Sequence, residues 1–453
     1  MKELLLKIYF YYFAILAKIY LFRHKPFIIW VTWSIWKTSC RMIISQILKK
    51  NLTSKVVYTS DKNFNGELWM SFSVLWISDY TPNFLWVVNI MLESLYISLF
   101  KPKKYDVIVL EYWIDHIWEM DFLLFVAKPD FSIITKIDKV HSKQFVNTSV
   151  TASEKYKLLI NSKNYSYLNA CDSYFEKYQK KIFTNKIVYS TDIWNNDKLD
   201  IFWENQEMIL QDNLAFLKFD LNHHWKKVFS VKTNMIWDEN IWYIAIWYDI
   251  LDKIYEMSYN NSFIEENLWK TFLLDLELQP SRFSIFKWIN NSVLVDSTYN
   301  AAPWSMKVVI SNTLKLHEKL YSDYELIFVL WEMRELWDYT ESEHHELADF
   351  SVNYCKNFYL VWDSMDKYFT QSLKKYEWIN YKHFKNSKLL WESLQEMVSK
   401  SDKKYLILFK WSQNTIFLEE AVKLLQYNPN DNLKVCRQLD YWLENKNKFF
   451  WQI

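Results

Sequence analysis

The 453-residue chain contains a single glycine, Gly66, and 25 tryptophans. Glycine supplies the left-handed backbone conformations of turns and helix ends, and an average protein of this length has roughly 32 glycines. The two residue types together number 26, close to a normal glycine content. We therefore expect most tryptophans to stand at glycine positions. Some bacterial lineages read the UGA codon as glycine and others as tryptophan, so translation with the wrong table would produce this composition.

The remaining composition describes an ordinary folded chain, with 51% hydrophobic and 24% charged residues. The length predicts two or three domains. Lys and Arg number 54 against 53 Asp and Glu, which gives no support for a nucleic-acid partner. The four cysteines lie far apart and form no CxxC pair, so we expect no disulfide framework or zinc knuckle, and a reducing, cytoplasmic location.

Residues 1–25 form an apolar segment that contains Lys7 and Lys18. A membrane-spanning helix usually has about 20 apolar residues with few charges. We expect instead an amphipathic helix that packs on the body of the protein or makes peripheral contact with a membrane surface. No small-residue cleavage site follows, which argues against a signal peptide.

Beyond residue 25, short apolar runs alternate with helical patterns, which favours an α/β fold with parallel sheets. The segment Leu276–Phe283 (LELQPSRF) interrupts the pattern and predicts a domain boundary. We expect an N-terminal helix (1–25), a central domain (26–279) and a C-terminal domain (280–453). The expected strands are 26–30, 55–59, 106–111, 131–135, 292–296, 325–331, 357–362 and 405–411. The expected helices include 37–50, 84–100, 304–321, 341–355, 384–400 and 415–427.

A candidate phosphate-binding loop follows the first strand. With Trp30, Trp33 and Trp36 read as glycine, residues 30–39 become G-V-T-G-S-I-G-K-T-S. Indoles would fill the anion site, whereas glycines let backbone N–H groups wrap a polyphosphate. Lys37 would meet phosphate charge and the Thr38 hydroxyl would bind Mg²⁺. The alternative is a surface loop with a chance KTS.

Two further residues follow apolar strands, Glu111 in VIVLEY and His141 in IITKIDKVH. A carboxylate at the carboxyl end of a parallel strand points into the site crevice, where Mg²⁺ prefers oxygen ligands. Taken singly, Glu111 is as readily a solvated side chain and His141 a structural or exposed loop residue.

Read with glycine for tryptophan, the order of motifs resembles the Mur ligase superfamily, and within it the UDP-N-acetylmuramoyl-tripeptide–D-alanyl-D-alanine ligases. The resemblance runs from about residue 26 to the C-terminus. Its segments are Trp30–Ser39, Asn63–Gly66 with Trp69, Glu111–Trp113 with Trp118-Glu119, Pro129-Asp130 with Ile134–Ile137 and His141, Asp296–Pro303 with Trp304–Met306, Trp331–Trp337 with His344, and Lys410–Ser412.

The resemblance implies a central P-loop-type parallel-sheet ATPase domain and a C-terminal Rossmann-like α/β domain. It implies an ATP-dependent ligase that joins a muramyl-peptide-like acid to a D-alanyl-D-alanine-like amine through an acyl phosphate. Such a reaction belongs to peptidoglycan precursor synthesis and so to cell-wall biogenesis, cell shape and cell division. We expect a monomer whose two domains close around ATP and the substrates.

The resemblance also assigns roles to residues. ATP would contact Trp33, Ser34, Trp36, Lys37, Thr38, Ser39, Arg282, Asp296 and Asn300. One Mg²⁺ would be held by Thr38 and Glu111, and a second with help from His141. A carbamylated lysine would lie near the second ion, with Lys155 the best match and Lys157 the next. Catalysis would rest on Lys37, Lys155 and His141, and the substrates would contact Glu335, His344, Lys410 and Ser412.

Several positions depart from the family pattern, namely Lys136, Glu239, Ala302 and Gln413. The candidate ATP loop begins at residue 30, which leads us to expect that the family's N-terminal UDP-substrate domain is absent and leaves the acid substrate open. The alternatives are a Mur-type ligase for another acid and amine, such as a folylpolyglutamate-like or other muramyl peptide pair, and a non-catalytic nucleotide-binding scaffold. Tryptophans taken literally would suggest a carbohydrate-binding protein with exposed indoles. We expect the literal sequence not to bind ATP.

Overall fold

The computed structural model describes two compact units of this chain. The first consists of Met1–Gln206, Phe219–Lys232 and Asp238–Leu276, and the second of Glu207–Lys218, Thr233–Trp237 and Glu277–Ile453. The main division follows Leu276, at the start of the predicted boundary segment. The described residues are 2–32, 37–59, 67–77, 84–112, 114, 117–134, 137, 148–190, 199–212, 214–223, 226–277, 280–299, 301–334, 336–411, 419–425, 435–438, 442–444 and 446–447.

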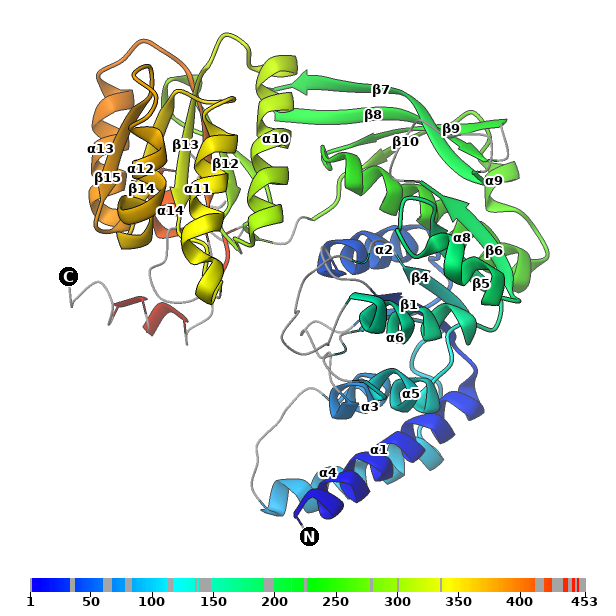
Figure 1. Cartoon of the computed structure of the whole chain (residues 1–453). Coiled ribbons are helices and arrows are strands. Elements are labelled where there is room, and N and C mark those ends of the chain that lie inside the picture. The colour runs from blue at the N-terminus through cyan, green and yellow to red at the C-terminus, as the bar shows by residue number, and fades with distance from the viewer. Residues whose placement is uncertain are drawn as a thin grey trace. The chain divides into compact units, whose positions relative to one another are not determined.

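The first unit is built on a six-stranded parallel sheet in the order β2-β3-β1-β4-β5-β6. β1 lies between β3 and β4, so the strand that leads to the candidate loop is internal (Figure 1). Its apolar sequence, FIIWVT, suits a strand covered on both faces. The bounds are β1 Phe27–Thr32, β2 Val57–Thr59, β3 Val107–Tyr112, β4 Phe131–Ile134, β5 Tyr165–Asn169 and β6 Asn185–Tyr189.

Helices surround this sheet, and the N-terminal helix α1 packs against α3, α4 and α5. Phe13, Ala17 and Tyr20 of α1 are fully buried in the same hydrophobic cluster as Ile28 of β1, which confirms the prediction that this segment packs on the body. The helices are α1 Lys2–His24, α2 Lys37–Asn51, α3 Glu67–Val74, α4 Phe84–Phe100, α5 Glu119–Val126, α6 Thr148–Ile160, α7 Phe175–Tyr178, α8 Asp238–Tyr259 and α9 Phe263–Glu266.

A four-stranded sheet, in the order β10-β9-β8-β7, follows the parallel sheet in the sequence. Its strands are β7 Ile201–Gln211, β8 Leu214–His223, β9 Lys226–Thr233 and β10 Thr271–Leu274. The two-residue connections from β7 to β8 and from β8 to β9 allow only antiparallel pairing. No strand was predicted here, because polar residues interrupt β7, β8 and β9, and the apolar runs of the four strands are at most four residues long.

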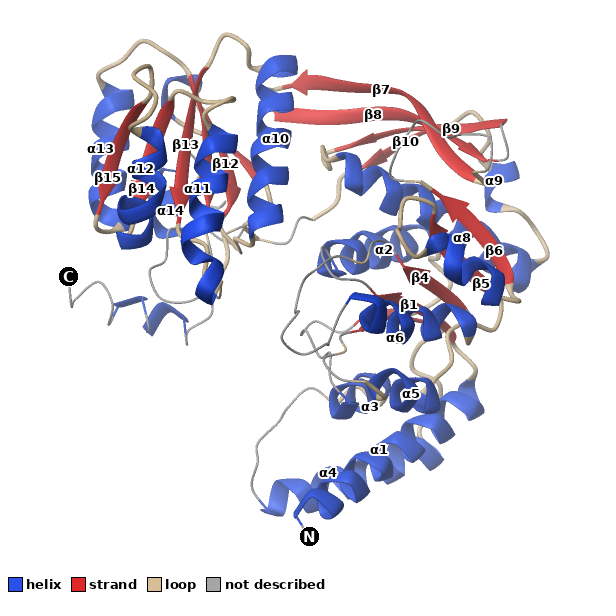
Figure 2. Cartoon of the chain, in the orientation of Figure 1, coloured by secondary structure: helices blue, strands red, loops and turns tan. Residues whose placement is uncertain are grey.

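The second unit contains a six-stranded sheet in the order β11-β12-β16-β13-β14-β15, parallel except for β11 (Figure 2). Residues of α13 and α14 form one hydrophobic cluster with one face of this sheet. The bounds are β11 Ser284–Lys287, β12 Val293–Ser297, β13 Glu325–Trp331, β14 Asn357–Val361, β15 Asn380–Phe384 and β16 Tyr405–Lys410; α10 Pro303–Leu320, α11 Thr340–Ser351, α12 Thr370–Leu373, α13 Ser387–Ser399 and α14 Glu419–Leu425.

The eight strands and six helices predicted from the sequence are confirmed, with shifts of one to three residues at most ends. The largest shift is in the helix predicted at 415–427, which is described only as Glu419–Leu425. The two α/β units confirm the predicted fold class. In the described residues, no helix is long and apolar enough to cross a membrane.

Candidate active site

The candidate nucleotide site begins where β1 gives way to α2. β1 ends at Thr32 and α2 begins at Lys37, so four residues, 33–36, form the connection and lie outside the described residues. A strand, a short loop and a helix start in this order place free backbone N–H groups at the carboxyl edge of the sheet, where an anion binds. The side chains of Lys37 and Thr38 are not described, but both residues stand in the first turn of α2.

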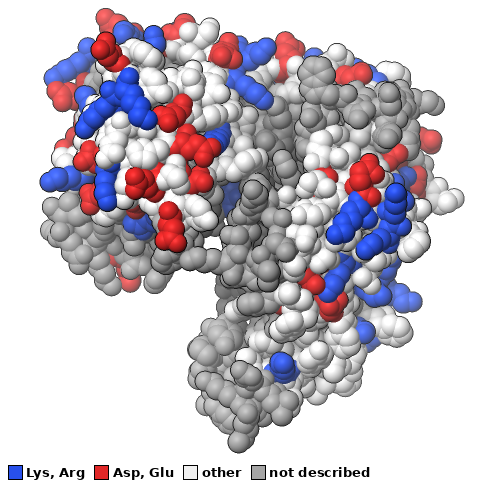
Figure 3. All heavy atoms as spheres, viewed as in Figure 1, with Lys and Arg blue, Asp and Glu red and all other residues white. Residues whose placement is uncertain are grey.

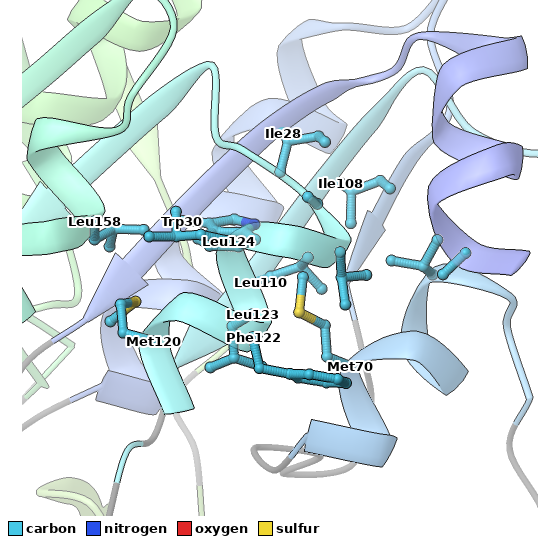
Figure 4. Close-up of a cluster of buried hydrophobic side chains, with 14 of the residues drawn as sticks. Ile28, Trp30, Met70, Ile108, Leu110, Met120, Phe122, Leu123, Leu124 and Leu158 are labelled. Atoms are coloured by element: carbon cyan, nitrogen blue, oxygen red, sulfur yellow. The ribbon is translucent and has the colours of Figure 1, made fainter. Parts of the chain in front are cut away.

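Trp30 lies within β1; the sequence placed it both at the end of the strand 26–30 and at the start of the loop 30–39. Its indole is fully buried between the sheet and α5, in the same cluster as Leu110, Leu124 and Leu158 (Figure 4). The strand is longer than predicted because Val31 and Thr32 also pair with Glu111 and Tyr112 of β3.

Glu111 occupies the position in β3 that faces the start of α2. Its Oε2 lies 3.6 Å from Nε of Arg41, and both side chains are about 95% buried. Burial, followed by the negative charge of Glu111, raises the pKa of the Cys40 thiol. A buried carboxylate beside the first turn of a helix, with Thr38 in that turn, supplies the oxygen chemistry that Mg²⁺ prefers.

The two candidate carbamylated lysines on α6 have different surroundings. Lys157 donates to Asp121 at 2.6 Å and to Glu154 at 2.8 Å, and its pKa is raised despite partial burial, because both carboxylates hold its charge. Lys155 is only 6% exposed. A carbamate forms on a neutral amine, so the ion-paired Lys157 is the poorer candidate of the two.

The remaining predicted residues of the first unit, Trp33, Ser34, Trp36 and His141, lie outside the described residues, and Ser39 is half-buried in α2. Within the described part of the chain, no group of three or more His, Cys, Asp and Glu side chains is placed to hold a metal ion.

In the second unit, neighbouring strands of the sheet leave its carboxyl edge in different directions. β13 continues to α11, while β16, its direct neighbour, continues towards α14. Ligands of open α/β sheets bind at such a switch point. The aromatic rings of Trp331, at the end of β13, and Trp411, just after β16, meet there with centroids 5.6 Å apart. Within the described residues, the Trp331 indole N–H is buried without a hydrogen-bond partner.

Three predicted residues gather at the ends of β12 and β16. Asp296 is fully buried and accepts hydrogen bonds from Ser281 (2.7 Å) and from the Thr298 hydroxyl (2.7 Å). The Lys410 ammonium lies 3.3 Å from the Ser297 carbonyl. Burial, and then the nearby Arg282, lowers the pKa of Lys410 to about 7. The Arg282 guanidinium stacks on the Tyr299 ring at 4.3 Å.

His344 was predicted to contact substrate, and in the structure it connects two elements. Its Nε2 accepts a hydrogen bond from the Met333 N–H at 3.1 Å, and its Nδ1 donates to the Thr340 carbonyl at 2.6 Å. Burial lowers its pKa, so the neutral ring is favoured. The imidazole therefore positions the segment after β13. Asn300, Glu335 and Ser412 lie outside the described residues.

Sequence reasoning missed Arg437, which joins this region from far along the chain. Its guanidinium donates to the Tyr299 carbonyl at 3.2 Å, lies 4.8 Å from the Trp411 ring and pairs with the buried Glu419 at 3.4 Å. No motif surrounds Arg437 in the sequence, so only the fold could reveal it.

Four described tryptophans have left-handed backbone conformations, with φ of 47° at Trp76, 81° at Trp118, 64° at Trp269 and 85° at Trp362. Four described asparagines also have left-handed backbone conformations. Asparagine tolerates this region best among the non-glycine residues. Tryptophan has no such tolerance, so these four positions are ones that glycine suits. Trp69, Trp86, Trp242, Trp247 and Trp391 lie inside helices, and the expectation that the tryptophans lie at turns is wrong for these five.

Comparison with known proteins relates this architecture to one family. The family described as the Mur ligase middle domain matches residues 31–240. A search of curated proteins found no match.

Solved structures share the fold over almost the whole chain. MurF from Acinetobacter baumannii superposes with a TM-score of 0.67 at 16% identity, over 91% of this chain and 79% of that one. MurF ligase from Thermotoga maritima in complex with ADP superposes with a TM-score of 0.63 at 18% identity, over 93% of this chain and 83% of that one. The S73A mutant of L. casei FPGS superposes with a TM-score of 0.56 at 13% identity, over 92% of this chain and 96% of that one.

Proposed function

We propose that this chain is an ATP-dependent ligase that joins an acid to an amino acid or short peptide, because residues 31–240 match the Mur ligase middle domain. The observation that carries the proposal is the placement of Glu111. Its buried carboxylate, on the strand next to β1, lies 3.6 Å from Arg41, one turn after Lys37 and Thr38 in α2.

The proposed reaction has two steps. A carboxylate oxygen of the acid attacks the γ-phosphorus of ATP, and ADP leaves with the electrons of the broken P–O bond. The amine then attacks the acyl carbon, phosphate leaves, and the amine loses a proton to give the amide. Phosphorylation is needed because a carboxylate oxygen is a poor leaving group.

The residues at the start of α2 would stabilise the moving phosphoryl group. The N–H groups of this helix start and the Lys37 ammonium would bind the phosphate oxygens, whose charge spreads in the transition state. Thr38 and Glu111 would hold Mg²⁺, which supplies charge neutralisation when bound. His141 and a carbamylated Lys155 would hold a second ion. The burial of Lys155, against the ion pairs of Lys157, supports that choice.

The proposal includes glycine at most tryptophan positions in the natural protein. The left-handed conformations of Trp76, Trp118, Trp269 and Trp362 support it, because each costs a non-glycine residue about 1–3 kcal/mol. Crowding supports it too. The rings of Trp203 and Trp242 have centroids 3.6 Å apart, whereas aromatic pairs favour about 4.5–7 Å.

For the substrates, we propose a muramyl-peptide-like acid and a D-alanyl-D-alanine-like amine, as in cytoplasmic peptidoglycan precursor synthesis. The higher TM-scores of the MurF structures support this pair. A folylpolyglutamate-like acid is the second candidate, and a different observation favours it. This chain matches 96% of the FPGS chain but 79% of the MurF chain.

The first experiment is the mass of the peptide 26–41 from protein made in its natural cell. Masses that fit glycine at positions 30, 33 and 36 would support the phosphate-binding loop. Masses that fit tryptophan would remove the loop and with it the ligase proposal.

The second experiment measures phosphate release by a W30G/W33G/W36G protein given ATP, Mg²⁺, each candidate acid and each candidate amine. We expect release that requires both substrates with one acid–amine pair. K37A in the same background is the control, and equal release by that variant would contradict the assigned role of Lys37.

A further inference from the structure

Helix α4 turns one apolar face to solvent. Six large side chains of α4 are 38–70% exposed, and the most exposed are Leu92 (62%) and Phe100 (70%). The opposite side of the helix is packed, with Ile90 and Ile97 buried in the core cluster. The exposed set is Val88, Leu92, Leu95, Tyr96, Leu99 and Phe100. Single exposed apolar residues are ordinary, but a continuous helical face of six is not.

Helix α1 carries a second exposed apolar stripe and lies beside α4. Ile8, Tyr11, Ile15 and Phe22 are 47–78% exposed and recur at the three- and four-residue spacing of one helix face. The Tyr12 hydroxyl donates to the Met91 carbonyl at 2.8 Å, and Arg23 donates to the Ser98 carbonyl. The two helices therefore run side by side in the same direction.

Basic side chains gather where these two helices end. Arg23 lies in the last turn of α1 and Lys25 directly follows the helix, while Lys101, Lys103 and Lys104 follow α4; all five are exposed. Asp106, which pairs with Lys103 at 2.8 Å, is the one acid among residues 18–25 and 96–106, all of which are described. In Figure 3 the atoms at the lower end of the view that belong to described residues are mostly white, with a blue side chain among them.

The cations lie close enough to disfavour one another's charge. Burial, and then Lys101, lowers the pKa of Lys104. Burial lowers the pKa of His24, and the positive charges of Arg23 and then of Lys103 lower it further. A negatively charged partner would relieve this repulsion.

We propose that the exposed faces of α1 and α4, with the five cations at their ends, form a docking surface for an anionic lipid bilayer. Apolar side chains would enter the boundary between headgroups and acyl chains, Tyr11 and Tyr96 would lie at headgroup level, and the cations would meet the lipid phosphates. The helices α1 and α4 of a second copy would offer these five cations two acids, Glu3 and Glu93, so charge complementarity favours the lipid surface.

The test is flotation of the full-length chain with vesicles of phosphatidylcholine alone and with 30% phosphatidylglycerol (about the anionic fraction that gives a strong surface potential). We expect binding at least tenfold tighter to the anionic vesicles. The K25Q/K101Q variant should bind roughly 25-fold more weakly, since each basic residue near such a surface contributes about fivefold.

A second variant tests the apolar face. L92Q/F100Q changes two exposed residues of α4 and should bind at least tenfold more weakly, while its circular dichroism stays unchanged. L389Q on α13 is the matched control, because Leu389 is 47% exposed in the other unit, and it should bind like the parent chain.

Three results would overturn the proposal. They are equal affinity for neutral and anionic vesicles, unchanged binding by L92Q/F100Q, and dimerisation in sedimentation experiments without vesicles that L92Q/F100Q abolishes. The last result would assign the face to a second copy of the chain. None of these outcomes depends on ligase activity.

Discussion

Arg41 and Glu111 form a buried ion pair that joins α2 to β3. The Arg41 Nε and Glu111 Oε2 atoms are 3.6 Å apart, and the two side chains are only 5% and 4% exposed. The pair fixes the start of α2 relative to the strand next to β1, which is the geometry that the proposed phosphoryl transfer needs.

Removal of one partner of this pair should destabilise the first unit. We expect R41M to lower the free energy of unfolding by about 3–5 kcal/mol, because the Glu111 carboxylate would stay buried without compensation. The R41M/E111M double variant should recover much of that loss. Urea unfolding of the full chain measures both.

The control for R41M is K103M, which breaks the more exposed pair with Asp106. This change should cost less than about 1 kcal/mol. A cost for R41M no greater than that for K103M would show that the buried pair does not hold α2 in place.

Replacement of Trp269 by glycine should stabilise the chain. Trp269 has a φ of 64° and is 72% exposed, so W269G relieves backbone strain while it removes few contacts. We expect a gain of about 1 kcal/mol in urea unfolding. L268G is the neighbouring control, with an ordinary φ, and should lose about 0.5–1 kcal/mol. A loss from W269G would mean that the indole itself stabilises this turn.

The stability of the second unit should depend on pH through Lys410. Its pKa is lowered to about 7 in the folded chain by burial and by Arg282, against 10.5 for an ordinary lysine. Between about pH 7 and pH 10.5 the unfolded chain binds the extra proton, so stability should rise with pH across this window and be lost as the pH falls towards 7.

The measurement for Lys410 is urea unfolding at several pH values, followed by tryptophan fluorescence. In the K410M variant the free energy of unfolding should no longer rise with pH across this window. In the parent chain the slope of that rise is at most about 1.4 kcal/mol per pH unit. Identical pH profiles for K410M and the parent chain would mean that Lys410 keeps its proton in the folded state.

The proposed carbamate predicts different effects at two neighbouring lysines. In the W30G/W33G/W36G protein, K155R should lower the rate of phosphate release by about 10–100-fold, because arginine cannot carry the carboxylate that would hold the second ion. K157R should change the rate by less than roughly twofold, since arginine preserves the ion pairs with Asp121 and Glu154.

Acetate provides the discriminating readout, because it can supply the missing carboxylate oxygens to K155A. We expect acetate to restore part of the phosphate-release rate of K155A and to leave the rate of K157A unchanged. Equal losses in K155A and K157A, without rescue, would remove the carbamate from the mechanism.

Much of the fold was predictable because its elements are specified locally. Continuous apolar runs such as FIIWVT and VIVLEY mark internal strands of the first sheet. The excess of tryptophan over glycine also pointed to turn positions, and the left-handed conformations of Trp118 and Trp362 agree with that interpretation.

The sequence by itself determined the alternating strands and helices of the two six-stranded sheets in large part, together with the helix start at Lys37 and the strand that carries Glu111, since periodicity and motif spacing are properties of neighbouring residues. Only the tertiary structure decided that Arg41 pairs with Glu111, that Arg437 joins Tyr299, and that His344 holds the segment after β13. These contacts connect residues from different elements, and their energies depend on burial and distance. No local pattern encodes either quantity. The four-stranded sheet β7–β10 was missed because polar residues divide its strands into short apolar runs.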